Sequence, residues 1–316
     1  MTLQQDPATR AYAAPGKIVV STDLTDLAYL LPHAIAQAKA SDASLILVHA
    51  VLPHESVPME SGAIPYYDPL RLDRDARLIL ENTAREVREQ GVVCTTAVRH
   101  GFVPDVVAEI VNNSGAGRLI IGTHGRRGLK KFVLGSIARQ LLESVDVPVC
   151  TVGPRAHKTP NAVESILHPV SLAGLHEASA SLSFDLARQF DAGLLLLHVV
   201  TPTASVNRDP GKTVSVATAQ LERLIPAAAR GFTQVQARIA LNSVVNEILA
   251  VAEETQAGLI VLGVHAPAHS WLPGTEPAAY KILVSAPCPV LSLRVNPIRE
   301  KVKAEQKEEA SPVVLG

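Results

Sequence analysis

The sequence predicts an α/β protein made of two tandem, doubly wound domains, each with a five-stranded parallel sheet. The chain has 316 residues, which is too many for one ordinary core and suits two domains of roughly 150 residues each. Its residues are 47% apolar and only 3% aromatic, a composition typical of buried parallel strands covered by helices. Short apolar runs also alternate with segments of helical periodicity, and this order occurs twice.

In the first half, strands are predicted at short apolar runs and helices where apolar residues recur every three to four positions. The predicted strands are 17–22, 43–51, 92–98, 118–123 and 148–152, and the predicted helices are 26–40, 71–91, 104–115 and 136–145. Strands separated by helices return parallel through right-handed crossovers. The first half should therefore form a doubly wound sheet.

The second half repeats this order. Its predicted strands are 165–171, 192–200, 233–240, 258–264 and 289–293, and its predicted helices are 173–191, one near 213–229, 243–256 and 277–286. A shift of 141 residues places Gly122 on Gly263, Ser144 on Ser285 and Pro148 on Pro289. This agreement indicates an internal duplication.

The duplication defines five segments along the chain. We expect a flexible N-terminus at 1–15, a first domain at 16–153, a linker at 154–162, a second domain at 163–295 and a charged, disordered tail at 296–316. The linker is polar and rich in proline, and the tail is dense in charge, as is typical of segments that do not pack.

The net charge and the targeting signals of the sequence limit the expected partners and the expected location of the protein. The formal net charge is −1, which gives no global electrostatic reason to bind nucleic acid or an anionic membrane, so neither is expected as a partner. The start of the sequence does not read as a signal peptide, and no apolar run approaches the ~20 residues of a membrane span. A cytoplasmic location is expected. The three cysteines form no paired motif and are predicted to be reduced packing residues, Cys94, Cys150 and Cys288.

One glycine-rich loop, "IGTHGRRGLKKFVLGS" at 121–136, is a candidate anion site. Two residues separate Gly122 from Gly125, nine separate Gly125 from Gly135, and Ser136 then opens a predicted helix. Free amides and the positive dipole end of a helix favour an anion. The alternative is that the glycines only permit a turn and that Ser136 only caps its helix. The loop also carries four basic residues, Arg126, Arg127, Lys130 and Lys131.

Other polar residues were weighed beside the loop. Asp23 ends the first predicted strand, where it could accept a hydrogen bond from a ribose hydroxyl or a base amine, or could cap the next helix. His124 lies inside the loop and, when protonated, could contact phosphate. His49 and His198 occupy equivalent strand ends with apolar flanks, which favours a structural role over a metal site or an acid–base pair.

At these residues the sequence resembles the universal stress protein family, specifically its tandem two-domain members. The resemblance also rests on "LVHA" at the end of the second predicted strand and on "PVCTV" as the last predicted strand. The resemblance covers about residues 16–295. It implies the strand order 3-2-1-4-5 in each domain and ATP bound at the crossover between the first and fourth strands. Whether Mg²⁺ accompanies the ATP is left open. It places Asp23 by the ribose and adenine, Ala50 by the adenine, Gly122, Thr123, His124 and Gly125 along the ribose and first phosphates, and Gly135, Ser136 and Ile137 at the outer phosphates. Arg126, in the basic loop, is added to these expected nucleotide-binding residues.

The second half departs from this pattern. At the same register Ala266 replaces Gly125, Glu276 replaces Gly135, Pro277 replaces Ser136 and Ser171 replaces Asp23. A carboxylate would repel phosphate and a proline lacks an amide donor. Although Gly274 and Thr275 leave room for a shifted loop, we expect the second domain to be a scaffold that does not bind ATP.

These observations favour an ATP-binding stress-response regulatory protein in which nucleotide occupancy orders the loop for an unidentified protein partner. Two alternatives remain open: a structural or interaction protein whose sites are vestigial, and a slow ATPase or a protein that autophosphorylates at Ser136. No catalytic residue is assigned, because no general base lies near Gly135 in the sequence pattern. No zinc, C-x-x-C or Walker motif occurs, and neither metal ligands nor a P-loop enzyme are expected.

The last strands of the two domains, within "VPVCTV" and "CPVLSL", would leave apolar edges unless they are covered. Family resemblance implies that such strands pair across a two-fold axis, so the two halves of one chain are expected to form an intramolecular pseudo-dimer. The ten-residue link at 153–162 reaches at most ~35 Å, which is enough. A further homodimer is left open.

Overall fold

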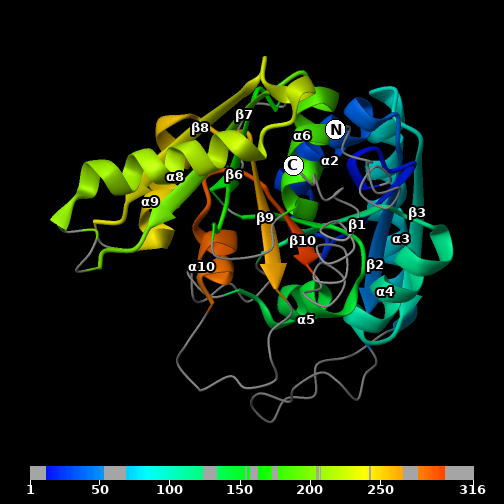
Figure 1. Cartoon of the computed structure of the whole chain (residues 1–316). Coiled ribbons are helices and arrows are strands. Elements are labelled where there is room, and N and C mark those ends of the chain that lie inside the picture. Colours follow the sequence, from blue (N-terminus) through cyan, green and yellow to red (C-terminus); the bar gives the residue numbers. More distant parts are fainter. Residues whose placement is uncertain are drawn as a thin grey trace, which may run out of the picture.

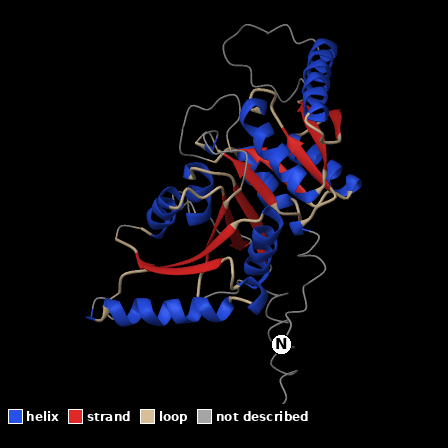
Figure 2. Cartoon of the chain, turned by 90° about the horizontal axis from the view of Figure 1, so that it is seen from above, coloured by secondary structure: helices blue, strands red, loops and turns tan. Residues whose placement is uncertain are grey.

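The structure, a computed structural model, is an α/β assembly with helices packed on both sides of a twisted sheet (Figure 1, Figure 2). It describes residues 12–52, 69–123, 134–153, 155–156, 163–172, 177–203, 206, 208–241, 243–265 and 277–295. The predicted tail at 296–316 and most of the predicted linker and N-terminus lie outside these residues.

The described part of the first half forms a five-stranded parallel sheet with four helices. Its strands are β1 (Lys17–Ser21), β2 (Ser44–Val51), β3 (Cys94–His100), β4 (Arg118–Gly122) and β5 (Val149–Val152), and its helices are α2 (Leu27–Ser41), α3 (Pro69–Glu89), α4 (Val103–Ser114) and α5 (Ser136–Ser144). The strand order is β3-β2-β1-β4-β5. The expected order 3-2-1-4-5 is therefore confirmed.

The second half repeats this arrangement. Its strands are β6 (Ser165–Pro169), β7 (Gly193–Val200), β8 (Thr233–Ile239), β9 (Leu259–His265) and β10 (Val290–Val295), and its helices are α6 (Glu177–Phe190), α8 (Pro210–Leu224), α9 (Val244–Glu254) and α10 (Ala278–Ser285). Counted from β8 inward, the strand order is again 3-2-1-4-5.

The two halves join edge to edge into one ten-stranded sheet. Strands β5 and β10 pair antiparallel, with Cys150 opposite Leu291 and Thr151 opposite Val290. The Thr151 hydroxyl also donates to the Val290 carbonyl at 3.3 Å. The expectation that the last strands pair within one chain is confirmed, and the outer strands of the sheet are β3 and β8.

Two apolar cores lie on opposite faces of this sheet, because successive strand residues point to opposite sides. Ile18 and Val20 belong to one core and Val19 to the other. Side chains from α2, α3, α6 and α8 fill the first core, and side chains from α4, α5, α9 and α10 fill the second. Each core draws residues from both halves of the chain, so the halves share their packing.

One helix of the second half differs from its prediction. A helix was expected near 213–229, whereas α8 begins at Pro210 after Asp209, whose side chain accepts from the Lys212 amide at 3.0 Å. It ends at Leu224, shortly before Pro226, and only a single 3-10 turn follows at Ala227–Ala229. Proline disfavours a helical conformation in the residue before it, and this explains the earlier end.

A buried arginine anchors the start of β4. Arg118 is 1% exposed and donates to the Gln37 side-chain oxygen at 2.9 Å and to the carbonyls of Tyr12 and Ala13 at 2.8 and 3.1 Å. Burial lowers the pKa of Arg118 to about 10. These bonds give acceptors to both terminal nitrogens of a guanidinium group that would be costly to bury alone, and they fix residues 12–13 to the sheet.

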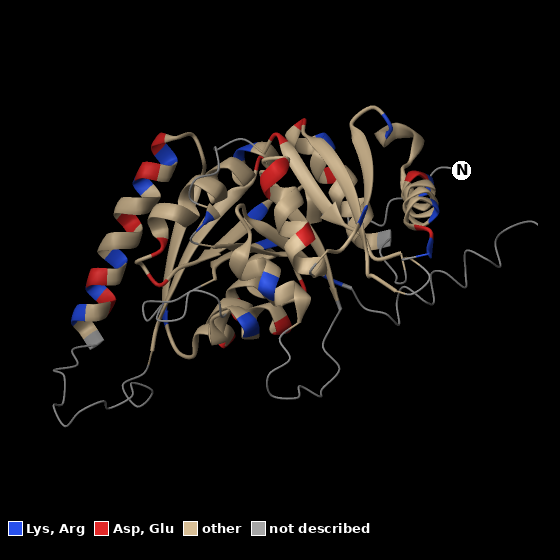
Figure 3. Cartoon of the chain, turned by 90° about the vertical axis from the view of Figure 1, so that its left-hand side faces the viewer, with Lys and Arg blue, Asp and Glu red and all other residues tan. Residues whose placement is uncertain are grey.

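Three global features complete the description. All three cysteines are buried and free, which confirms their prediction as reduced packing residues. Acidic and basic residues are interspersed over the helices (Figure 3), in keeping with the small net charge. Among the described residues, no helix has both the length and the apolar character to cross a membrane.

Candidate functional site

The candidate site lies where β1 and β4 end side by side. The two strands pair in parallel, with Ser21 opposite Ile121. The chain leaves β1 toward β2 on one side, while β4 is followed by β5 on the other side. Ligands of doubly wound sheets bind in the crevice at such a reversal of strand order. The residues just beyond these strand ends, Asp23 and Thr123 among them, therefore meet at this edge.

Asp23 is half-buried in the turn after β1. Its Oδ1 atom accepts hydrogen bonds from the backbone N–H and the hydroxyl of Thr25, at 2.8 and 2.6 Å. The side chain thus stabilises its own turn and does not cap α2, whose N-cap residue is Asp26. These bonds hold the carboxylate at the mouth of the crevice.

A second carboxyl group, which the sequence did not single out, lies beneath Asp23. Asp26 is 5% exposed and accepts a hydrogen bond from the Thr22 hydroxyl. Burial, with a contribution from the nearby charge of Asp23, raises the pKa of Asp26 to about 6. Thr22 Oγ1 in turn accepts from the amide of Leu24 at 2.9 Å, and Leu24 has a left-handed backbone with φ 75°. The turn after β1 is thus built around a buried acid.

On the other side of the crevice, Thr123 connects β4 to the start of α5. Thr123 is fully buried, and its amide donates to the Val152 carbonyl at 3.1 Å. Its own carbonyl accepts from the Gly135 amide at 3.0 Å. A Cβ atom at position 135 would lie 3.3 Å from this carbonyl, so the close approach favours glycine. The bond fixes the beginning of α5 next to the end of β4.

The start of α5 faces solvent. Gly135 occupies the N-cap position with φ −57° and ψ 145°, and the first two helical residues, Ser136 and Ile137, are exposed. The first amides of a helix have no acceptor within it, and the dipole makes this end positive. The arrangement offers amide donors and one hydroxyl to an anion.

The opposite wall comes from β2. Ala50, which is 8% exposed, pairs with Arg99 of β3. Next to it, His49 Nδ1 lies 2.8 Å from the Thr22 carbonyl, and the equivalent His198 makes the same contact with the Val170 carbonyl at 2.8 Å. The repeated contact to the backbone supports the structural interpretation of both histidines.

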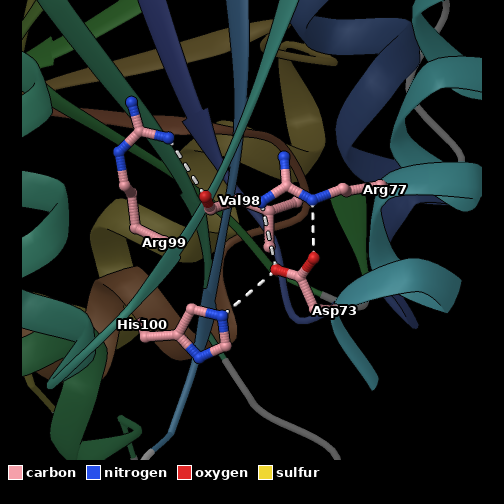
Figure 4. A network of polar contacts seen from close by, with 5 residues as sticks. All are labelled: Asp73, Arg77, Val98, Arg99 and His100. Atoms are coloured by element: carbon pink, nitrogen blue, oxygen red, sulfur yellow. Dashed lines mark hydrogen bonds and ion pairs between the residues drawn. The ribbon is translucent and has the colours of Figure 1, made fainter. Parts of the chain in front are cut away.

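A polar cluster behind this wall ties α3 to the end of β3 (Figure 4). Asp73 accepts from Arg77 Nε at 2.6 Å and from Nη2 at 3.1 Å, and its Oδ1 atom lies 3.2 Å from His100 Nε2. The Arg77 hydrogen bond, and secondarily that of His100, lower the pKa of Asp73. The cluster is exposed, so it contributes little stability, but it orients α3 beside the strand that flanks Ala50.

Part of the predicted site lies outside the described residues. These are His124, Gly125 and Arg126, together with the rest of the basic loop at 124–133. The remaining predicted residues lie at or just beyond the carboxyl ends of β1, β2 and β4 and at the start of α5: Asp23, Ala50, Gly122, Thr123, Gly135, Ser136 and Ile137.

The corresponding edge of the second half differs at the helix start. The sequence register placed Pro277 opposite Ser136, but in the structure Pro277 is the N-cap residue, with φ −57° and ψ 147°. It thus occupies the same helix position as Gly135, because α10 begins one residue later than α5 in that register, while both helices end at matching serines. Proline has no backbone N–H, so the Gly135 bond has no counterpart there. Ser171 stands where the first half has Asp23, while Ala266 and Glu276 lie outside the described residues.

Comparisons with known proteins agree with this architecture. The model of the universal stress protein family matches residues 15–153 and again 165–294. Universal stress protein MJ0531 of Methanocaldococcus jannaschii is 29% identical over 139 residues, which cover 43% of this chain and 81% of that protein. Universal stress protein YxiE of Bacillus subtilis is 27% identical over 146 residues, which cover 43% of this chain and 97% of that protein.

Solved structures resemble the whole chain. A putative universal stress protein from Pseudomonas aeruginosa UCBPP-PA14 has a TM-score of 0.62 at 21% identity and covers 96% of this chain and 100% of its own. A universal stress protein from Archaeoglobus fulgidus DSM 4304 has a TM-score of 0.64 at 15% identity and covers 88% of this chain and 98% of its own. At these identities the likeness establishes the fold alone.

Proposed function

Because this chain belongs to the universal stress protein family, we propose that it is an ATP-binding regulatory protein of the stress response whose first domain holds the nucleotide. The observation that carries the proposal is the hydrogen bond from the Gly135 amide to the Thr123 carbonyl. It brings the amino end of α5 to the crevice between β1 and β4, where a doubly wound sheet binds its ligand.

The residues around this crevice fit an adenine nucleotide. Amides at the start of α5 and the Ser136 hydroxyl would donate to the phosphate oxygens, which are strong acceptors. Asp23 would accept from a ribose hydroxyl, and the backbone of Ala50 would bond to the adenine. Gly122, at the end of β4, leaves room for the ribose. ATP itself would supply the negative charge that these donors require.

The second domain would not bind nucleotide in the same way. Pro277 occupies the N-cap of α10 and offers no amide. Ser171 replaces the carboxylate that Asp23 presents in the first domain. We therefore assign the second domain the role of a scaffold, with a single nucleotide for the whole chain.

The proposed output of the site is regulatory. Phosphate binding between Thr123 and Gly135 would order the loop from Arg126 to Leu134, which carries the basic residues. An ordered loop would present a different surface to a protein partner than an unordered one. No general base is assigned that would activate a water molecule for attack on ATP, so ATP turnover would be slow.

Native mass spectrometry of the purified chain tests this function. The protein is measured intact and then denatured, and any released nucleotide is identified. The proposal expects ATP or ADP released in at most one copy per chain, and binding of added ATP to chains that carry none. A chain that neither carries nor binds a nucleotide would favour an interaction protein with vestigial sites. A phosphate retained on Ser136 after denaturation would favour autophosphorylation.

A further inference from the structure

Helix α5 lies between its own domain and the second domain. Its buried residues Ala138 and Leu141 belong to the core that both halves share, and the helix packs against α4. Figure 1 shows α10 of the second domain near α5 on the same side of the molecule. Two side chains from the second domain, Tyr280 and Arg294, contact α5 directly.

Tyr280 holds α5 at two points. Its hydroxyl donates to the Glu143 carboxylate at 3.0 Å, and the Arg139 guanidinium lies over its ring, 5.2 Å from the centroid. Residues 139 and 143 are neighbours on one helix face, so the Tyr280 side chain contacts two residues that lie one turn apart on α5. Tyr280 is 3% exposed. Burial, and then the bond to Glu143, raise the pKa of Tyr280 to about 12, so its hydroxyl is a donor at neutral pH.

Arg294 holds the carboxyl end of the same helix. Its Nη2 atom donates to the Leu142 carbonyl at 3.4 Å, and its Nη1 atom lies 3.7 Å from the Asp146 carboxylate. A cation at this end of a helix is also favoured by the helix dipole. Tyr280 and Arg294 together therefore contact α5 from its second turn to just beyond its end.

These polar contacts matter because the packing beside them is incomplete. A cavity that offers about 20 Å³ to the centre of a water molecule lies between α5 and the second domain, room for about one water. It is lined by Leu142, Val149, Leu283 and Ser292 among others. Within the described part of the chain, the buried Ser292 hydroxyl has no hydrogen-bond partner. Close packing alone does not fix the helix here.

We propose that Tyr280 and Arg294 are positioning residues for the nucleotide site of the first domain, although neither belongs to that domain. This inference rests on the proposed function. The amides at the start of α5 face the phosphates, so their direction depends on the orientation of the whole helix. The second domain thereby sets the phosphate affinity of the first.

The test compares ATP with AMP in the full-length protein. Tyr280→Phe keeps the ring over Arg139 and removes only the bond to Glu143. We expect its ATP dissociation constant to rise roughly 3- to 10-fold, the effect of one weakened hydrogen-bond set. AMP, which lacks the outer phosphates, should bind within about 2-fold of the wild type. Glu143→Ala should reproduce this split, whereas Glu143→Gln, which keeps an acceptor oxygen, should restore most of the ATP affinity.

Glu253→Gln is the matched control. Glu253 pairs with Arg155, which also donates to the Ser285 carbonyl at 3.0 Å, so this contact also joins the two halves but does not touch α5. The control should leave ATP affinity unchanged. Hydrogen exchange of the ligand-free protein should show faster exchange at 139–144 in Tyr280→Phe than in the control.

The outcomes separate the two proposals. If the wild type binds ATP and Tyr280→Phe binds it equally well, or loses ATP and AMP affinity alike, the positioning role is wrong and the proposed function stands. If the wild type does not bind ATP, the proposed function is wrong and this inference falls with it.

Discussion

The backbone N–H of Gly135 donates to the carbonyl of Thr123 at 3.0 Å, across a loop whose ends these two residues form. The bond sets the start of α5 beside the end of β4, while the second half has Pro277 at the same helix position. The backbone N–H at this helix position is thus present in the first domain and missing in the second, and this distinguishes the two candidate sites.

Gly135→Pro transfers this difference to the first domain. The φ of −57° at Gly135 suits proline, so the backbone can keep its conformation while the bond to the Thr123 carbonyl is lost. We expect ATP affinity to fall roughly 10-fold or more, because the start of α5 loses the bond that holds it beside the end of β4. Gly135→Ala, which also adds a Cβ atom but keeps the N–H, is the control and should bind ATP more tightly than the proline variant. Equal affinities in calorimetry would show that the amide does not matter.

Asp26 should make stability depend on pH. Its pKa is about 6 in the folded protein, against about 3.9 in an unfolded chain. The folded state therefore binds the proton more tightly, and this stabilisation is present below about pH 4 and is lost as the pH rises through about 6. The loss is on the order of 2–3 kcal/mol.

Urea unfolding at pH 4 and pH 7 measures this contribution. Between these values the wild type should lose more free energy of unfolding than Asp26→Asn, which cannot ionise. The same pH dependence in both proteins would mean that Asp26 ionises in the folded state as it does in water.

Separating the two halves of the chain should expose the edge of β5, through which fragments would associate. In the intact chain β10 covers β5, and a fragment that ends at residue 156 lacks that partner. Unpaired apolar strand edges associate, so we expect the fragment to form dimers or larger species in light scattering while the full chain keeps its β5 edge covered. A fragment that stays monomeric with the ATP affinity of the full chain would show that the pairing of β5 and β10 is dispensable.

The elements of this fold could be predicted because their signals are local. Among the described residues, apolar periodicity located the strands and helices, apart from the ends of α8, and the family resemblance supplied the strand order. Gly122 and Gly135 were predicted as site residues from the spacing of the glycine loop and from the family resemblance, and this stays a prediction. Each of these features depends on residues near one another in the sequence.

The contacts that were missed join distant residues. Tyr280 bonds to Glu143 across 137 positions and Arg118 bonds to Tyr12 across 106. Neither pair leaves a periodic signal, and Arg118 at the start of a strand would be expected to face solvent. The raised pKa of Asp26 likewise depends on burial, which the sequence around it does not reveal.

The number of nucleotides bound by one full-length chain tests the central claim most directly. Titration calorimetry with a non-hydrolysable ATP analogue measures it, with protein concentration fixed by amino-acid analysis. The account predicts a stoichiometry near one, which Gly135→Pro weakens and which a substitution at Ser171 leaves unchanged. Two equivalent sites per chain would contradict the role given to Pro277, and the absence of binding would contradict the proposed function itself.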